Sequence, residues 1–72
     1  MTTAEIEAIV KQIMGNELNM DTSELNSQTE MDGVDLRMKF EEEFDVVIPT
    51  KDAENFQTIG DAVEYIDNLL NG

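Results

Sequence analysis

The side chains that could do chemistry in this sequence are almost all carboxylates. Asp and Glu together number 17, Lys and Arg number 4, and His and Cys are absent. Without Cys there is no disulfide, thiolate zinc site or sulfur nucleophile. Without His, the most common general acid–base group near neutral pH is missing. Ser23 and Ser27 are the only serines. The available chemistry is therefore that of an anionic surface with few nucleophiles.

The carboxylates do not form a pattern that predicts a metal site or catalysis. A calcium loop needs Gly at its sixth position and Glu at its twelfth, but around Asp32-Gly33 the closing position falls on Lys39. The run Glu41–Glu43 with Asp45 is expected to be a solvated helix face that binds cations weakly at most. Paired glycosidase carboxylates need a cleft, for which 72 residues leave little room. We expect no catalytic residue, no metal site and no enzyme.

Composition and charge restrict the partners of the chain. A formal charge of −13 and a pI near 4.1 exclude nucleic acid, which needs a basic footprint, and anionic membrane surfaces. Apolar runs such as Val46-Val47-Ile48 are far too short to span a bilayer. The N-terminal residues have no basic flank or apolar run of a secretory signal. We therefore expect a single cytoplasmic domain over residues 1–72, a monomer without a membrane span.

The two ends of the chain carry the clearest helix patterns. Thr2 and Glu5 have capping-box spacing, and apolar residues then recur at helical intervals up to Met14. Gly15 is expected to close this first helix in the left-handed conformation. In the last helix Thr58 is the expected cap, and an apolar face follows that consists of Ile59, Val63, Ile66, Leu69 and Leu70.

Two short elements are expected between these helices. The segment Asp21–Glu24 is typical of one helical turn that ends on the apolar Leu25. Pro49 ends the preceding element and can begin a short turn through Asp52–Glu54. Phe56 then follows as an apolar anchor for the core.

The middle of the chain supports two interpretations. Apolar and charged residues alternate from Val34 to Phe40, which is a strand period. Against a strand, Glu41–Glu43 strongly favours helix, and Leu36, Phe40 and Phe44 are spaced for one helical face. We predict a helix from about Val34 to Asp45, with a strand as the alternative.

These elements predict an all-α fold, a small bundle of three main helices plus a one-turn helix. The methionines Met14, Met20, Met31 and Met38 are expected to be flexible core filler. The predicted core consists of Ile6, Val10, Ile13, Leu25, Phe40, Phe44, Ile48, Phe56, Ile59, Val63, Ile66 and Leu70.

From Phe40 onward the sequence resembles acyl carrier proteins. The stretch Phe40–Pro49 is similar to the exit of that family's second helix, and Asp52–Phe56 and Thr58–Ile66 are similar to its third and fourth helices. The first helix and the segment Leu18–Leu25 are also similar. The resemblance implies a non-enzymatic carrier of fatty-acid or related acyl or polyketide biosynthesis, with an acyl-carrier-like bundle whose second helix is shortened.

The resemblance also implies a cofactor and a mode of docking. Members of the family hold acyl groups on a 4′-phosphopantetheine arm, which is attached to a serine of an Asp-Ser-Leu motif at the start of the second helix. An acyl chain can withdraw into the bundle, and the methionines would then line its pocket. The acidic second helix docks onto basic surfaces of acyl-metabolism enzymes. Here the docking residues would be Asp32, Asp35, Glu41, Glu42 and Asp45.

The attachment motif itself is absent. Aligned by Val34–Phe44, the chain lacks the whole serine-bearing loop; aligned by Asp32–Asp35, Gly33 takes the place of the serine. The expected attachment position near Asp32, Gly33 and Val34 therefore has no hydroxyl group.

Other residues also depart from the family pattern. Ser27 is a weak substitute for the missing serine because it lacks the flanking Asp and Leu, and Ser23 is expected to cap a turn or face solvent. Arg37 and Lys39 place two cations on the acidic helix. The alternative to a loaded carrier is therefore an armless, carrier-like module that binds or regulates a partner.

Overall fold

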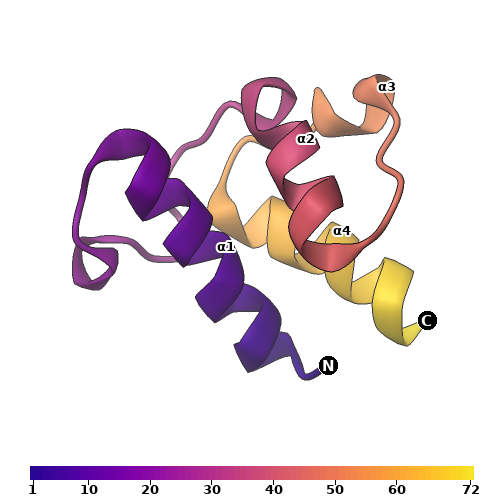
Figure 1. Ribbon diagram of the computed structural model, residues 1–72, viewed down its shortest axis with the longest axis horizontal. Helices are drawn as coiled ribbons and strands as arrows, with labels where there is room; N and C mark the ends of the chain where they lie inside the picture. Colours follow the sequence, from indigo (N-terminus) through magenta and orange to yellow (C-terminus); the bar gives the residue numbers. More distant parts are fainter.

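The computed structural model describes residues 1–72 as a helical bundle without a β-strand (Figure 1). This confirms the predicted all-α class, with three main helices, one short helix and one additional helical turn. In chain order the elements are α1 (Thr3–Leu18), η1 (Thr22–Glu24), α2 (Gly33–Phe44), α3 (Thr50–Ala53) and α4 (Ile59–Asn71).

Capping boxes fix the starts of the two long outer helices, as the sequence predicts. At α1 the Thr2 N–H donates to Glu5 Oε1 at 2.8 Å, and the Glu5 N–H donates to Thr2 Oγ1 at 3.2 Å. Thr58 and Asp61 exchange the same pair of bonds at α4. Each box satisfies backbone N–H groups that have no partner within the helix.

The predicted end of α1 at Gly15 is wrong. The helix continues to Leu18, and the left-handed residue is Asn19, with φ 55° and its N–H bonded to the Gly15 carbonyl. Gly15 is buried, and a Cβ atom there would lie 2.9 Å from the Met20 carbonyl oxygen. The glycine therefore allows the returning chain to approach the helix closely and does not itself turn the chain.

The segment between α1 and α2 is fastened along the start of α4. The Gly60 N–H donates to the Ser27 carbonyl at 2.8 Å, the Ile59 N–H to the Thr29 carbonyl at 3.0 Å, and the Met31 N–H to the Gln57 carbonyl at 3.0 Å. Three backbone bonds thus hold residues 27–31, which belong to no helix, and lead the chain to the first residue of α2.

The observed core is close to the predicted one. All the predicted core residues are buried except Leu70, which is 37% exposed because the last turn of α4 extends beyond the other helices. The structure adds Met14, Leu36, Ala53 and Ala62 to the core. Met14 is core filler as predicted, whereas Met20 and Met38 are exposed, so that prediction is wrong for these two methionines.

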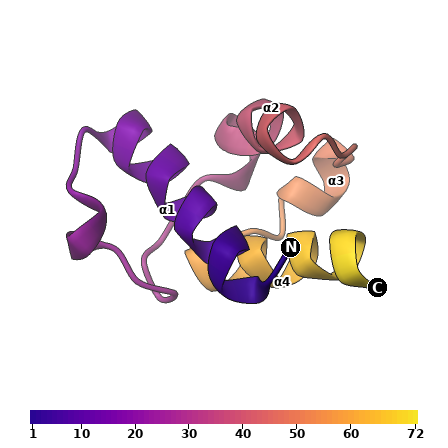
Figure 2. The ribbon, with the colours of Figure 1, turned by 60° about the horizontal axis from the view of Figure 1, so that its bottom comes forward.

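The helices form two pairs. α1 packs mainly against α4, and α2 packs mainly against the short α3. Figure 2 shows α2 and α3 on one side of α4, with the start of α2 at the far side from both chain ends. No helix has the length and apolar content needed to cross a membrane.

Candidate functional site

Helix α2 carries most of the residues to which the sequence assigns a function. Leu36, Phe40 and Phe44 are buried at i, i+4 and i+8, so the helical prediction is confirmed and the strand alternative does not form. The helix begins at Gly33, one residue before the predicted Val34, and ends at Phe44, one residue before the predicted Asp45, which is its left-handed C-cap with φ 53°. Burial of one apolar stripe leaves the remainder of α2 facing solvent.

The start of α2 is capped by its own carboxylate. Asp32 Oδ1 accepts hydrogen bonds from the Val34 N–H at 3.2 Å and the Asp35 N–H at 3.4 Å. A helix N-terminus is an anion-binding position because its N–H groups are free and its dipole is positive. In this protein the Asp32 side chain already occupies that position.

Gly33, the first residue of α2, is packed against α3. A Cβ atom at Gly33 would clash with the Ala53 carbonyl oxygen and lie 2.5 Å from the Phe56 Cβ. The structure therefore brings Asp32, Gly33 and Val34 to the helix start, where the sequence places the attachment position. No residue from Glu30 to Asp35 has a hydroxyl group.

A groove of about 650 Å³ lies at this helix start, between the end of α1, the start of α2 and α3. Its lining includes the apolar side chains of Met14, Met31, Val34 and Phe56. It also includes five carboxylate residues, which are Glu17, Glu30, Asp32, Asp35 and Glu54. The groove therefore combines an apolar floor with a negatively charged lining.

The serines lie away from the start of α2. The Ser27 carbonyl accepts from the Gly60 N–H, so Ser27 is at the start of α4. Ser23 is in η1, and its N–H donates to Asp21 Oδ1 at 3.0 Å. That hydrogen bond lowers the pKa of the Asp21 carboxyl. The structure therefore brings neither serine to the expected attachment position.

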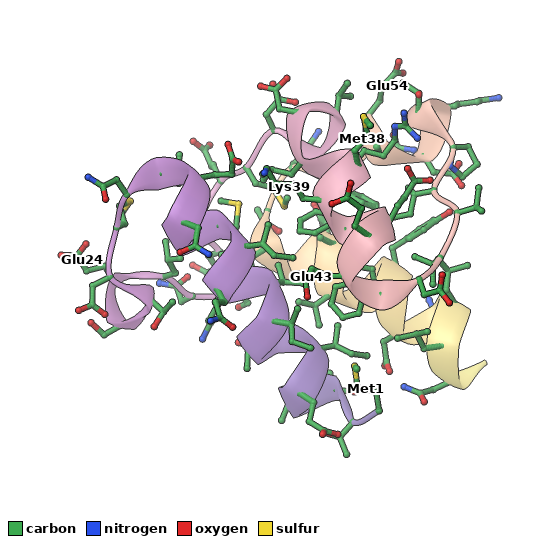
Figure 3. The ribbon with its side chains drawn as sticks, in the orientation of Figure 1. Met1, Glu24, Met38, Lys39, Glu43 and Glu54 are labelled. Carbon is green, nitrogen blue, oxygen red and sulfur yellow. The ribbon has the colours of Figure 1, made fainter.

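The outward side of α2 presents acids around an exposed methionine. Asp35, Met38 and Glu42 are separated by three and four residues and share one helical stripe. Asp45 continues it at the end of the helix. Met38 is 63% exposed, and none of these three acids takes part in an ion pair. Figure 3 shows Met38 on α2 among the side chains that point away from α4. We call Asp32, Asp35, Met38, Glu42 and Asp45 the acidic face.

The two cations of α2 are held by neighbouring carboxylates. Lys39 Nζ lies 3.0 Å from Glu17 Oε1 and links α2 to α1; Figure 3 shows Lys39 on the α1 side of α2. Arg37 Nη1 lies 3.0 Å from Glu41 Oε1 and donates to the Ile48 carbonyl at 3.1 Å. These cations are therefore engaged within the molecule.

Glu41 differs from the other predicted docking acids. Its Oε2 accepts from the Ile48 N–H at 2.8 Å, so Arg37 and Glu41 together bond both backbone groups of Ile48. We call these three residues the loop clamp, because they hold the segment between α2 and α3. The i,i+4 spacing of Arg37 and Glu41 predicts their ion pair, but nothing in the sequence indicates Ile48 as the third partner.

Tyr65 connects α4 to the wall of the groove. Its hydroxyl donates to Asp52 Oδ2 at 2.7 Å, and its ring centroid lies 5.1 Å from that of Phe56. The hydrogen bond to Asp52, with smaller contributions from desolvation and the carboxylate charge, raises the pKa of Tyr65 to about 12.

The carboxylates of the molecule do not gather into a group of three that could hold a metal ion.

The fold and site together define a class of protein: a small, strongly acidic helical module with an exposed face on its second helix. No family model matches the sequence. Two curated relatives, each named acyl carrier protein, come from two strains of Porphyromonas gingivalis, one of them W83. Each is 33% identical over 76 residues, which cover 93% of this chain and 97% of the relative. The chain belongs to the acyl carrier protein family. Proteins of this family are not themselves enzymes.

This chain has fewer residues than these relatives over the aligned region. Because 93% of 72 residues is about 67, about nine of the 76 aligned positions have no residue of this chain. The family implies a 4′-phosphopantetheine group, but the residues at the start of α2 do not fit its attachment. There is no hydroxyl group, Gly33 has no room for a side chain, and Asp32 occupies the free N–H groups.

Proposed function

We propose that this protein acts in fatty-acid biosynthesis, or in a related acyl or polyketide pathway, as a module that docks onto basic surfaces of the enzymes. Family membership supports the metabolic role. The acidic face of α2 is the observation that supports the docking role, because it offers negative charge around an exposed apolar side chain. A basic partner would gain speed and orientation of encounter from the charge, and contact area from Met38.

The surroundings of the acidic face support this role. The ion pairs of Arg37 and Lys39 with Glu41 and Glu17 leave Asp35 and Glu42 without an intramolecular cation. A formal charge of −13 adds a long-range attraction for any basic surface. The loop clamp holds the segment after α2 in one arrangement, so that less ordering is needed when a partner binds.

The docking test uses charge reversal at one position of the acidic face. Glu42→Lys is compared with Glu64→Lys. The second variant makes the same change at an exposed residue of α4 whose side chain has no hydrogen bond or ion pair. Affinity for purified carrier-dependent enzymes of fatty-acid biosynthesis is measured by calorimetry at two salt concentrations. We expect E42K to weaken binding by roughly tenfold, about 1.4 kcal/mol, while E64K changes it by less than about twofold.

Salt and Met38 provide two further readouts of the same experiment. Affinity should fall as salt shortens the Debye length from about 10 Å at 0.1 M to about 3 Å at 1 M. Met38→Ala should weaken binding without changing its salt dependence, because it removes apolar area and no charge. Equal losses for E42K and E64K, or affinity independent of salt, would contradict docking through the acidic face.

A further inference from the structure

We infer that this chain has no attachment position for a phosphopantetheine arm, and that no single substitution at Gly33 can restore one, because α3 closes the start of α2. This inference concerns the covalent chemistry of the chain and does not depend on the docking proposal. It follows from the packing of Gly33, from the charges around the helix start and from the positions of the remaining hydroxyl groups.

The first observation is steric. A side chain at Gly33 would meet the Ala53 carbonyl oxygen and the Phe56 Cβ, which are backbone and near-backbone atoms. Ala53 and Phe56 are 0% and 4% exposed, and the Phe56 N–H donates to that same Ala53 carbonyl at 3.1 Å. These atoms cannot move aside as the end of a flexible side chain would. Gly33 therefore faces the core, where an attached arm would have to pass through α3.

The second observation is electrostatic. The Val34 and Asp35 N–H groups, which could stabilise a phosphodiester at a helix start, already donate to Asp32. Glu30, Asp35 and Glu54 line the same groove. Lys39 lies near this end of the molecule but pairs with Glu17. A phosphodiester placed here would meet carboxylates, and none of the residues that line the groove is a Lys or Arg, which opposes its binding.

The third observation concerns the other hydroxyl groups. Thr2 and Thr58 accept hydrogen bonds as helix caps, and the Thr29 hydroxyl accepts from the Asn26 N–H at 2.9 Å. Ser27 is bonded through its carbonyl to the start of α4. Ser23 is in the three-residue turn η1, and its N–H group donates to the Asp21 carboxylate. None of these hydroxyl groups lies at the start of α2. Thr50 begins the four-residue helix α3, whose N-cap Pro49 makes no side-chain hydrogen bond, but it lacks the Asp-Ser-Leu sequence to which the family's arm is attached.

These observations predict what would create an attachment position. A serine must lie outside the contact between Gly33 and α3, which extra chain before Asp32 would provide and which exchanging the side chain of Gly33 cannot provide. On such a serine the hydroxyl oxygen would attack the pantetheine-side phosphorus of coenzyme A. A new P–O bond forms between the serine oxygen and this phosphorus. The P–O bond to the adenosine-side phosphate breaks, adenosine 3′,5′-bisphosphate leaves with that oxygen, and the hydroxyl proton passes to solvent.

The experiment compares the natural chain with Gly33→Ser and with two insertion variants. Each insertion places a nine-residue loop between Met31 and Asp32, and the pair differs only in whether the loop contains Asp-Ser-Leu or Asp-Ala-Leu. All four proteins are incubated with coenzyme A, Mg²⁺ and a broad-specificity phosphopantetheinyl transferase. A carrier protein with an Asp-Ser-Leu motif serves as the positive control. Intact mass reports attachment, and thermal unfolding with near-UV circular dichroism reports folding.

The natural chain is the deciding sample. We expect no mass gain on it or on G33S, a lower melting temperature or loss of the fold for G33S, and a gain of one phosphopantetheine on the serine insertion alone. A mass gain on the natural chain would overturn the inference. A folded G33S of unchanged melting temperature, or one that is loaded, would overturn the steric argument. A folded serine insertion that stays unloaded would show that closure by α3 is not the obstacle.

Discussion

Tyr65 shows how one side chain contributes to the arrangement of the site. Its hydroxyl bonds to Asp52 at 2.7 Å, and its ring packs on Phe56, which in turn lies against Gly33. The bond joins α4 to α3 next to the start of α2 without entering the core. Because the neutral phenol donates to a carboxylate, loss of its proton breaks the bond and places two negative charges side by side.

The ionisation of Tyr65 provides a prediction at this scale. Its pKa is raised from 10.0 to about 12 in the folded protein. The stability from this bond is therefore complete below pH 10 and is lost as pH rises toward 12. Ultraviolet titration of the phenolate should give a midpoint well above 10, and Asp52→Asn should bring the midpoint down toward 10. The sole tyrosine makes the signal unambiguous; an ordinary midpoint in the natural chain would exclude the bond in solution.

The sequence is informative about individual residues where the cause is local. The caps Thr2 and Thr58 are recognisable because a hydroxyl and a carboxylate three residues apart satisfy nearby N–H groups. The roles of Gly15 and Gly33 cannot be recognised in the sequence, because each depends on another segment that packs against the glycine. This segment contains Met20 in the case of Gly15 and is α3 in the case of Gly33. A glycine predicts a special backbone position, but only the fold shows whether this is a turn or a close approach.

At the scale of elements, the loop clamp explains how α2 and α3 keep their relative positions. The segment between them contains Val46 and Val47, and Val47 is 80% exposed, so apolar burial alone does not hold it. Instead, Arg37 and Glu41 bond the carbonyl and the N–H of Ile48, whose side chain is fully buried. The clamp therefore couples the end of α2 to the core through one residue.

Removal of the clamp should destabilise the protein more than removal of a neighbouring acid. Glu41→Ala leaves the Ile48 N–H and the Arg37 guanidinium without their partner, which should cost about 1–3 kcal/mol. Glu43→Ala removes an exposed acid without such bonds and should change the free energy of unfolding by less than about 0.5 kcal/mol. Urea unfolding of both variants measures the difference. Equal stability of the two variants would contradict the clamp.

The helices themselves could be predicted far better than the segments between them. The helical stripe of Leu36, Phe40 and Phe44 agrees with the propensity of Glu41–Glu43, and agreement of two independent signals identified α2. The segment from Asn26 to Met31 has no periodicity, and its backbone bonds go to α4, far away in sequence. The groove is unpredictable for the same reason: three elements and the closing contact of Gly33 form it together.

On the scale of the whole molecule, the balance of charge governs behaviour. The three ion pairs use Lys11, Arg37 and Lys39, which leaves most of the 17 acidic residues unpaired. Like charges spread over 72 residues repel one another and oppose the compact state. The same charge favours encounter with basic partners. The same excess of negative charge therefore opposes folding and attracts basic partners.

Salt should consequently stabilise the isolated protein. Raising the ionic strength from about 0.01 M to 1 M shortens the Debye length from about 30 Å to 3 Å and screens the repulsion. The melting temperature, measured by circular dichroism, should rise, with each 1 kcal/mol gained worth about 4–8 °C in a domain of this size. A melting temperature that falls with added sodium chloride would show that the three ion pairs outweigh the repulsion.

The two ends of the chain are joined by a contact that has a practical consequence. The Asn71 amide donates to the Met1 carbonyl at 2.7 Å, and Thr3 bonds to Asp67 at 3.1 Å. Figure 1 shows both ends far from the start of α2. A fluorescent tag, a surface anchor or a second protein could therefore be fused at either end, or the ends could be linked and the chain reopened elsewhere, while the second helix stays accessible.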